Sequence, residues 1–206
     1  MTELFKPCDN RIITEDEKKE ILDKLEKQFK GILETMLFNT NDPNLKETPK
    51  RIAKAWFLEL LSGRYVEKPK ITVFPNENNI DQMVTLGNIE VKSMCSHHFL
   101  PFFGKCFIGY VPDKTIIGIS KLARIVKWFA RRAQLQEVLT KQIADFIYEI
   151  IKPKGVIVYM SCIHTCMTLR GANQPLDTKL VTTDVRGCME SENAKTEFLK
   201  YIGEIR

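Results

Sequence analysis

The order of helical and strand-like hydrophobic patterns constrains the fold of this chain more than any other feature. Apolar residues recur at helical spacing up to about residue 63, alternate with polar residues between about 71 and 112, and return to helical spacing from about 120 to 150. A strand, a weaker strand and a closing helix follow. Because the strands come in groups and do not alternate singly with helices, we expect an α+β fold with a mostly antiparallel sheet and packed helices, preceded by N-terminal helices.

Capping residues and helix-ending residues locate the helices. Thr14 and Glu17 match a capping box, and Thr48 before Pro49 is typical of a helix N-cap and first turn. Ser120 is expected to cap a later helix. The helices are expected over 15–37, 48–63 and 192–202, with two more between 120 and 152.

Alternation of apolar and polar residues predicts the strands. The candidates are 89–94, 105–111 and 156–162, the last continuing toward Arg170, with a weaker strand over 178–184. Gly87 and Asn88 fit either a two-residue hairpin turn or a bulge within one long strand, and the pattern leaves both open.

Composition narrows the class of protein. Of 206 residues 44% are apolar, and the net charge of +5 is too small to indicate nucleic acid as a partner. No stretch approaches the ~20 apolar residues of a membrane helix, and no secretory signal is visible at the N-terminus. We therefore expect a cytoplasmic protein with no membrane partner, whose six cysteines are reduced.

All three histidines lie beside cysteines, in Cys95-Ser-His-His98 and Cys162-Ile-His-Thr-Cys166. Thiolates and imidazoles are the ligands that zinc prefers, and three protein ligands leave a position open for water, as in catalytic zinc sites. Strand alternation would turn both cysteines and the histidine of the second motif to one face. Spacing does not choose among these ligands, and it leaves open a four-ligand structural zinc or ordinary buried cysteines. The remaining cysteines, Cys8, Cys106 and Cys188, are expected to be packing residues.

Basic residues occur in three small groups that suit a phosphate-rich ligand. Arg51 and Lys54 share a helix face, Lys121 and Arg124 repeat that spacing, and Arg170 follows the second metal motif. Each pair alone is more typical of a solvated face. Because phosphate oxygens bind clustered cations and helix N-termini, three such groups around a metal suggest a bound polyphosphate.

Five motifs in order resemble the GTP cyclohydrolase I family. They are Thr48-Pro-Lys-Arg-Ile-Ala53, Cys95-Ser-His-His-Phe-Leu-Pro101, Ile117-Gly-Ile-Ser-Lys-Leu-Ala-Arg-Ile-Val126, Gln134-Leu-Gln-Glu137 with Leu139-Thr140, and His164-Thr-Cys-Met-Thr-Leu-Arg-Gly171. The resemblance covers about residues 48 to 198. We expect an N-terminal helical extension, 1–45, and a catalytic domain, 46–206.

The resemblance implies the tunnel-forming T-fold and a zinc-dependent hydrolase acting on GTP. The family's enzymes open the imidazole ring at C8, release formate and form 7,8-dihydroneopterin triphosphate, the first step of pterin and folate-type biosynthesis. The residues matching its metal ligands are Cys95, His98 and Cys166. The family also implies self-association to a ring-shaped homodecamer with active sites between subunits.

The resemblance assigns roles to the other candidates. His164 matches the acid–base histidine, and His97 is a second candidate for proton transfer. Glu137 matches the residue that accepts hydrogen bonds from N1 and N2 of guanine, and Gln136 is expected to assist it. Ribose and triphosphate are expected to contact Ser120, Lys121, Arg124, Arg170, Arg51 and Lys54.

Two features depart from the family pattern. Cys162 stands where a small non-ligand residue is expected and, on the predicted strand face, could compete for zinc or oxidise with Cys166. The segment after Gly171 lacks the usual Ser/Thr-rich strand, so contacts from that strand are not carried over. The alternatives are a related T-fold enzyme acting on a pterin or deazapurine, and a non-catalytic zinc-stabilised binding protein.

Overall fold

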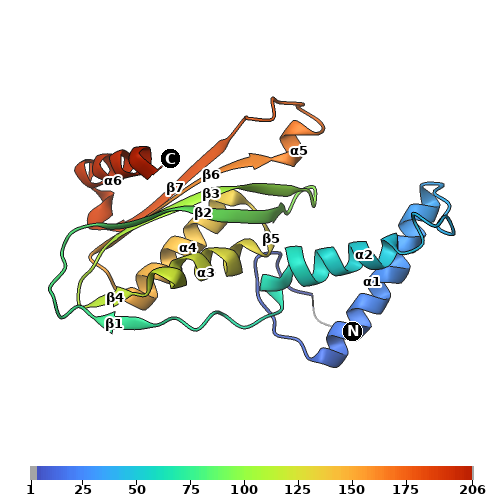
Figure 1. Ribbon diagram of the computed structural model, residues 1–206, viewed down its shortest axis with the longest axis horizontal. Helices are drawn as coiled ribbons and strands as arrows, with labels where there is room; N and C mark the ends of the chain where they lie inside the picture. The colour runs from blue at the N-terminus through green and yellow to red at the C-terminus, as the bar shows by residue number, and fades with distance from the viewer. Residues whose placement is uncertain (1–3, 206) are drawn as a thin grey trace.

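A five-stranded sheet organises the computed structural model, which describes residues 4–205 (Figure 1). Its strand order is β5-β2-β3-β6-β7, and every pair is antiparallel except β2–β5. The bounds are β2 Val84–Cys95, β3 Pro101–Val111, β5 Ala133–Gln134, β6 Gly155–His164 and β7 Leu180–Gly187. The predicted α+β class with a mostly antiparallel sheet is therefore confirmed, although β5 was not predicted.

The register of β2 decides between the two interpretations of Gly87 and Asn88. β2 pairs with β3 from Val84 to Met94, on both sides of a register shift between Leu86 and Ile89. Asn88 has a φ of +56°, a conformation that a bulge residue commonly adopts. The two residues thus form a bulge within one long strand. A separate two-stranded sheet pairs β1 (Val73–Pro75) with β4 (Thr115–Ile117).

Helices cover both faces of the sheet. Helices α3 (Ile119–Ala130) and α4 (Gln136–Ile151) pack on one face, where apolar residues such as Ile125 and Ile147 meet the inward residues of the strands. Helix α6 (Glu192–Ile205) packs on the other face. A side chain at Gly109 would meet the ring of Phe198 at 2.7 Å, so glycine is needed where α6 approaches β3.

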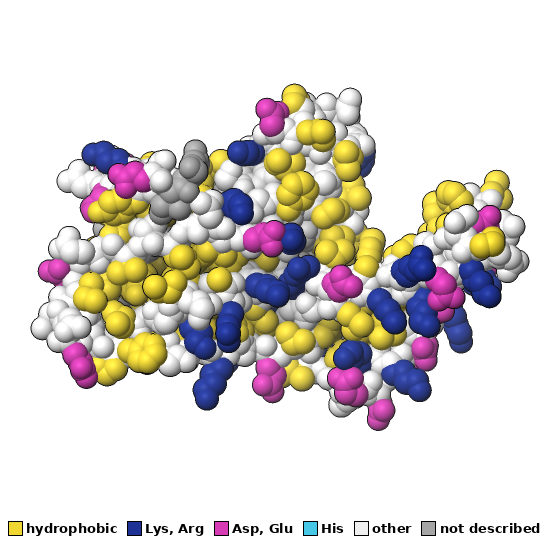
Figure 2. All heavy atoms as spheres, viewed as in Figure 1, with side chains coloured by type: hydrophobic (Ala, Val, Ile, Leu, Met, Phe, Trp, Pro, Cys, Tyr) yellow, Lys and Arg dark blue, Asp and Glu magenta, His cyan; other side chains and the backbone are white. Residues whose placement is uncertain are grey.

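Helices α1 (Glu15–Thr35) and α2 (Thr48–Lys54) form an arm that projects from one end of the sheet (Figure 1). A π-helical turn, Ala55–Leu60, and a 3-10 turn, Ser62–Arg64, join the arm to the body. No residue of α1 is fully buried, and apolar side chains are exposed at the arm's outer end (Figure 2), where the exposed residues are Ile32, Met36, Leu37 and Phe38. The arm thus presents apolar surface away from its own sheet.

The predicted helix starts were partly right. Thr14 and Glu17 form both hydrogen bonds of the capping box, as expected. Thr48 is the first residue of α2 and not its N-cap, which is Glu47. Ser120 does not cap α3 either, because the helix begins at Ile119 with Gly118 as N-cap and without a side-chain cap hydrogen bond.

The strand expected to continue toward Arg170 ends earlier. β6 stops at His164, and a helical turn, α5 (Thr165–Thr168), follows. His164 is paired with Phe102, next to the first residue of β3, so the strand runs out of a partner there. Cys166 therefore lies on a helical turn and not on the strand face shared by Cys162 and His164.

Of the cysteines expected to pack, Cys106 is fully buried, Cys8 is half-buried and Cys188 is exposed. The packing interpretation was therefore wrong for Cys188. Within residues 4–205, no helix combines the length and the apolar character needed to cross a membrane.

Candidate metal centre and active site

The turn between β2 and β3 presents two of the predicted metal ligands. Cys95 is the last residue of β2, and its carbonyl accepts a hydrogen bond of 2.9 Å from the amide of Phe99. The Cys95 amide in turn donates to the carbonyl of Leu100 at 2.9 Å, and Phe99 has a φ of +51°. These bonds close a tight turn that carries His98 to the same side as the Cys95 thiol.

The third ligand comes from α5. The hydroxyl of Thr165 donates to the carbonyl of Pro101 at 2.6 Å, which holds the start of α5 against the start of β3. Cys166 follows directly. As a result the ligand atoms of Cys95, His98 and Cys166 all lie within 4.8 Å of one another.

This three-residue group, which we call the metal group, suits a zinc ion. Ligand atoms around tetrahedral zinc are roughly 3.5–3.8 Å apart, so only small side-chain movements are required. Cys95 is buried, Cys166 is half-buried and His98 is exposed, which leaves the group open on the histidine side. Burial and the neighbouring Cys95 thiol raise the pKa of Cys166, against the influence of Arg170. A bound cation would reverse that effect and favour the thiolates.

Cys162 lies outside the metal group. It is fully buried in the main core beside Gly104, and burial raises the pKa of its thiol to about 12. A thiol in such surroundings is inert. The expectation that Cys162 shares a face with Cys166 is wrong, because only Cys162 is on the strand.

His164 is held from two sides. Its ring stacks on Phe102, with centroids 4.5 Å apart and planes at 4°. Its Nε2 lies 2.9 Å from Oε1 of Gln136. Burial lowers the pKa of His164, and the nearby carboxylate of Glu137 partly offsets this, so the site favours the neutral imidazole.

The contacts of Gln136 fix the tautomer of that histidine. The Gln136 side chain is completely buried, and its Nε2 donates toward the carbonyls of Met160 and Leu180 at 3.2 and 3.1 Å and toward the Thr182 hydroxyl at 3.0 Å. The amide nitrogen must face these carbonyls, so Oε1 faces His164 and accepts a hydrogen bond from it. In neutral His164 the proton is therefore on Nε2, and Nδ1 is left as the basic nitrogen.

Residues 25–203 match the family model described as GTP cyclohydrolase I. The chain belongs to the GTP cyclohydrolase I family. It is 43% identical over 185 residues to the GTP cyclohydrolase 1 of Wolinella succinogenes, covering 88% of this chain and 96% of that protein. It is 41% identical over 193 residues to the enzyme of Saccharomyces cerevisiae, covering 92% and 78%, and 39% identical over 196 residues to that of Porphyromonas gingivalis, covering 94% and 100%.

Several candidate residues lie near the metal group of this GTP cyclohydrolase I chain. Glu137 is exposed in the first turn of α4 and lies within electrostatic reach of His164. Arg170 is exposed and close enough to Cys166 to influence its pKa. His97 is exposed next to His98, with the two ring centroids 6.3 Å apart. These residues share the end of the sheet at which the metal group lies.

The remaining substrate-binding candidates lie on α3 and on the arm. Ser120 and Lys121 lie at the start of α3, which begins beside β4 at the opposite end of β2 from Cys95 (Figure 1). The 12 residues of β2 span roughly 36 Å. Arg51 and Lys54 are exposed on the arm, whose following turn contacts the metal-ligand turn, because the Trp56 ring stacks on Phe99 with centroids 5.5 Å apart. Within the described residues, no hydrogen bond or ion pair joins these side chains or Arg124 to the metal group.

The residues that hold His164 in place were not predicted from the sequence. Phe102, Thr165 and the buried network around Gln136 carry no local motif, because their partners are separated by 24 to 64 residues along the chain. The only hint is a glutamine in the first turn of an apolar helix, one residue before an acidic one.

Proposed function

We propose that Cys95, His98 and Cys166 hold a zinc ion and that this centre serves the family's reaction, hydrolysis of GTP to 7,8-dihydroneopterin triphosphate and formate. The observation that supports it most is the convergence of three ligand atoms within 4.8 Å from two separate chain segments. Two thiols and an imidazole suit zinc better than magnesium or calcium. When bound, zinc supplies Lewis acidity and lowers the pKa of water near neutrality.

His164 is the acid–base group of this proposal. Its Nδ1 is unprotonated in the neutral ring, so it can take a proton from the reacting groups and later return one. Gln136 acts as a positioning residue, because its Oε1 accepts from His164 and its two N–H groups are shared among three acceptors of the sheet. In this proposal Gln136 positions His164 and does not contact the substrate, although the sequence predicted that it assists Glu137. His97 is the second candidate for proton transfer.

Glu137 binds the guanine edge in this proposal. Its carboxylate is exposed, and it offers two acceptor oxygens to the N1 and N2 donors of the base. Arg170 is near enough to reach a substrate that contacts the metal group. Ser120, Lys121, Arg124, Arg51 and Lys54 would hold ribose and triphosphate.

Ser120 and Lys121 are too far from the metal group within one copy, and self-association would bring those of a neighbouring copy to it. The start of α3 and the metal group lie at opposite ends of the sheet, so a neighbouring copy would have to supply one of them. The exposed apolar end of the arm offers surface for such contacts. We infer a ring-shaped homodecamer in the cytoplasm, with residues 1–45 as a helical extension of a catalytic domain over 46–206.

The purified protein tests the proposal. We expect GTP to yield stoichiometric formate and the absorbance of dihydroneopterin triphosphate, with guanosine as a much poorer substrate. Equal turnover of GTP and guanosine would remove the triphosphate role of the cationic residues and would favour an enzyme acting on a pterin or deazapurine. Bound zinc without product would favour a non-catalytic binding protein.

A further inference from the structure

The guanidinium of Arg132 is buried without enough partners. The residue is 3% exposed and comes after Arg131, the C-cap of α3. Its Nη1 donates to the carbonyl of Cys8 at 2.7 Å, and its Cζ lies 3.9 Å from the ring centroid of Trp128. Nε and Nη2 are buried and have no hydrogen-bond partner within residues 4–205.

No carboxylate in the described part of the chain compensates this charge by direct contact. The carboxylate of Asp9 acts on it electrostatically without contact, and it accepts from the amide of Lys6 at 3.1 Å. Arg64 adds a second positive charge to the same region. Burial accordingly lowers the pKa of Arg132 to about 10. A buried charge of this kind is costly unless a counter-ion or further hydrogen bonds satisfy it.

A cavity of about 500 Å³ lies against this guanidinium. Arg132 and Gln142 line it from the body of the protein, and residues of the segment 5–11, which we call the strap, line it from outside. Oε1 of Gln142 is also buried and without a partner among the residues described. The two parallel donors of the Nε–Nη2 edge and the acceptor of Gln142 thus belong to residues that line the cavity, but these atoms are enclosed, so a ligand reaches them only when the strap moves aside.

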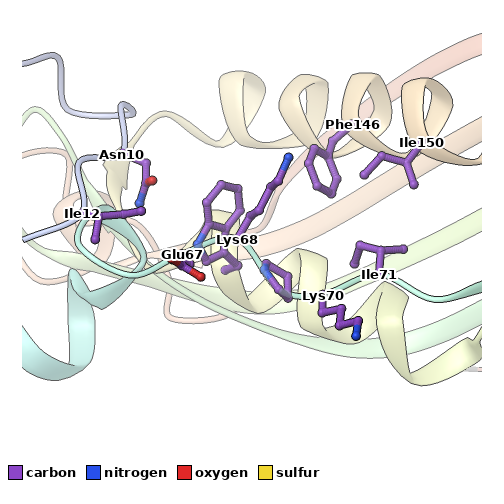
Figure 3. Close-up of a pocket in the computed structure, with 10 residues that line it drawn as sticks. Asn10, Ile12, Glu67, Lys68, Lys70, Ile71, Phe146 and Ile150 are labelled. Carbon is purple, nitrogen blue, oxygen red and sulfur yellow. The ribbon is translucent and has the colours of Figure 1, made fainter.

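A larger neighbouring cavity of about 620 Å³ has no such unpartnered polar atoms among its described lining residues (Figure 3). Phe146 and Ile150 point from α4 toward the segment that carries Ile71. The amide of Asn10 at its edge donates to the carbonyls of Gly63 and Val66, both at 2.9 Å. None of its described lining residues has a buried, unpartnered polar atom, so nothing there selects a ligand.

We propose that the Arg132 cavity binds a small oxyanion that also carries a hydroxyl group. The Nε–Nη2 edge of a guanidinium matches two oxygens of a carboxylate or phosphate in bidentate fashion. Gln142 Oε1 then requires a donor, which the P–OH of hydrogen phosphate or the hydroxyl of an α-hydroxycarboxylate supplies. Arg11, the other cation lining the cavity, is paired with Glu17 at 2.8 Å, so Arg132 carries the recognition.

The strap controls access to this cavity. Backbone groups of the strap form four hydrogen bonds with the body: Arg132 donates to Cys8, Arg64 Nη1 donates to the carbonyls of Lys6, at 2.9 Å, and of Pro7, and the Arg11 amide donates to the Arg64 carbonyl at 2.7 Å. The side chain of Asn10 adds its two bonds to Gly63 and Val66. Some of these bonds have to open for an anion to enter, and they can reform over it. Binding does not depend on GTP turnover, so its test is separate from that of the proposed function.

Trp128 reports on occupancy because the Arg132 guanidinium stacks on it. The chain has two tryptophans, and Trp56→Phe leaves Trp128 as the sole indole. In this background we expect inorganic phosphate and lactate to change the fluorescence saturably. Acetate, which lacks the donor for Gln142, should bind about tenfold more weakly, the effect of one hydrogen bond.

Two variants and one control make the result decisive. Arg132→Gln should abolish the saturable change, whereas Arg131→Gln, which alters the adjacent arginine outside this cavity, should preserve it. If Arg132→Gln fails to fold, Gln142→Leu keeps the guanidinium and should make phosphate and acetate bind equally. Absence of a saturable response, or a response that survives Arg132→Gln, would show that the cavity holds only water or that the anion binds elsewhere, and would overturn the proposal.

Discussion

Replacing Gln136 with leucine tests whether this buried amide sets the tautomer of His164. The substitution keeps the volume of the side chain approximately and removes the acceptor that lies 2.9 Å from His164 Nε2. Without that acceptor, the proton of the neutral ring is free to move to Nδ1. The nitrogen proposed to take the substrate's proton would then be blocked in a large share of the molecules.

The expected magnitudes follow from the contacts. The amide has two N–H donors and one acceptor in use, and each buried hydrogen bond contributes about 1 kcal/mol. We therefore expect Gln136→Leu to lower the free energy of unfolding by about 2–3 kcal/mol. Positioned acid–base groups contribute about 10²–10⁴-fold to rate, so GTP turnover should fall by about 100-fold.

A matched variant separates positioning from simple destabilisation. The Thr140 hydroxyl donates to the Gln136 carbonyl at 2.8 Å and lies 2.6 Å from the Thr182 hydroxyl, but it does not contact His164. Thr140→Val should reduce stability by about 1–2 kcal/mol while kcat stays within about threefold. Gln136→Glu retains an acceptor for His164 and should recover part of the activity lost in Gln136→Leu.

The assays are urea unfolding, metal content and formate release from GTP for each variant. Zinc content should be equal in all of them, because neither Gln136 nor Thr140 is a ligand. If Thr140→Val and Gln136→Leu each lost activity in proportion to their loss of unfolding free energy, the positioning role of Gln136 would be refuted.

Three further substitutions test other parts of the site and fold. His164→Ala should keep its zinc but lose about 10²–10⁴-fold in GTP turnover, as measured by metal analysis and formate release. Cys162→Ala should lower the free energy of unfolding, measured in urea, by about 1 kcal/mol without changing zinc content. Loss of zinc in this variant would show that Cys162 is a zinc ligand. Asp145→Asn should cost up to about 1 kcal/mol at pH 7, because Asp145 pairs with Arg186 at 2.6 Å but is 39% exposed and screened. Burial alone would raise the pKa of Asp145, but hydrogen bonds from Lys141 and Arg186 lower it below the unfolded value of about 4. The stabilisation by the ion pair is therefore fully present above the unfolded pKa and is lost as the pH falls through the folded pKa. A difference between wild type and Asp145→Asn that persists at pH 2 would contradict that pairing.

Local features were predictable from sequence because their partners are close along the chain. The capping box joins Thr14 and Glu17, three residues apart, and forms as expected. Cys95 and His98 belong to one tight turn, so their short spacing already placed two ligand types together. The mostly antiparallel sheet followed in the same way from the grouping of the strands.

The errors came from contacts between distant segments. The run after His164 has the composition of a strand, but β3 begins at Pro101 and offers no partner beyond it. The Thr165 hydroxyl bonds the Pro101 carbonyl, 64 residues away, and the chain turns into α5. Similarly, Gly118 donates its amide to the Thr72 carbonyl, and α3 begins there in place of the cap expected at Ser120.

Gln136 illustrates the same limit at the active site. Its position beside Glu137 suggested a contact with guanine, yet its partners are Met160, His164, Leu180 and Thr182 on two other strands. Nothing near Gln136 in the sequence indicates those strands. A glutamine completely buried in the first turn of a helix is recognisable only once the sheet is assembled beneath it.

The most direct test of the metal centre is zinc content measured together with GTP turnover in the wild-type protein and in Cys166→Ser. We expect about one zinc per chain in the wild type, because its ligands form a single three-residue group. Cys166→Ser should lose zinc and formate release together, and added zinc should restore activity to chelator-treated wild type but not to the variant. Full GTP turnover by protein free of metal would contradict the proposed centre.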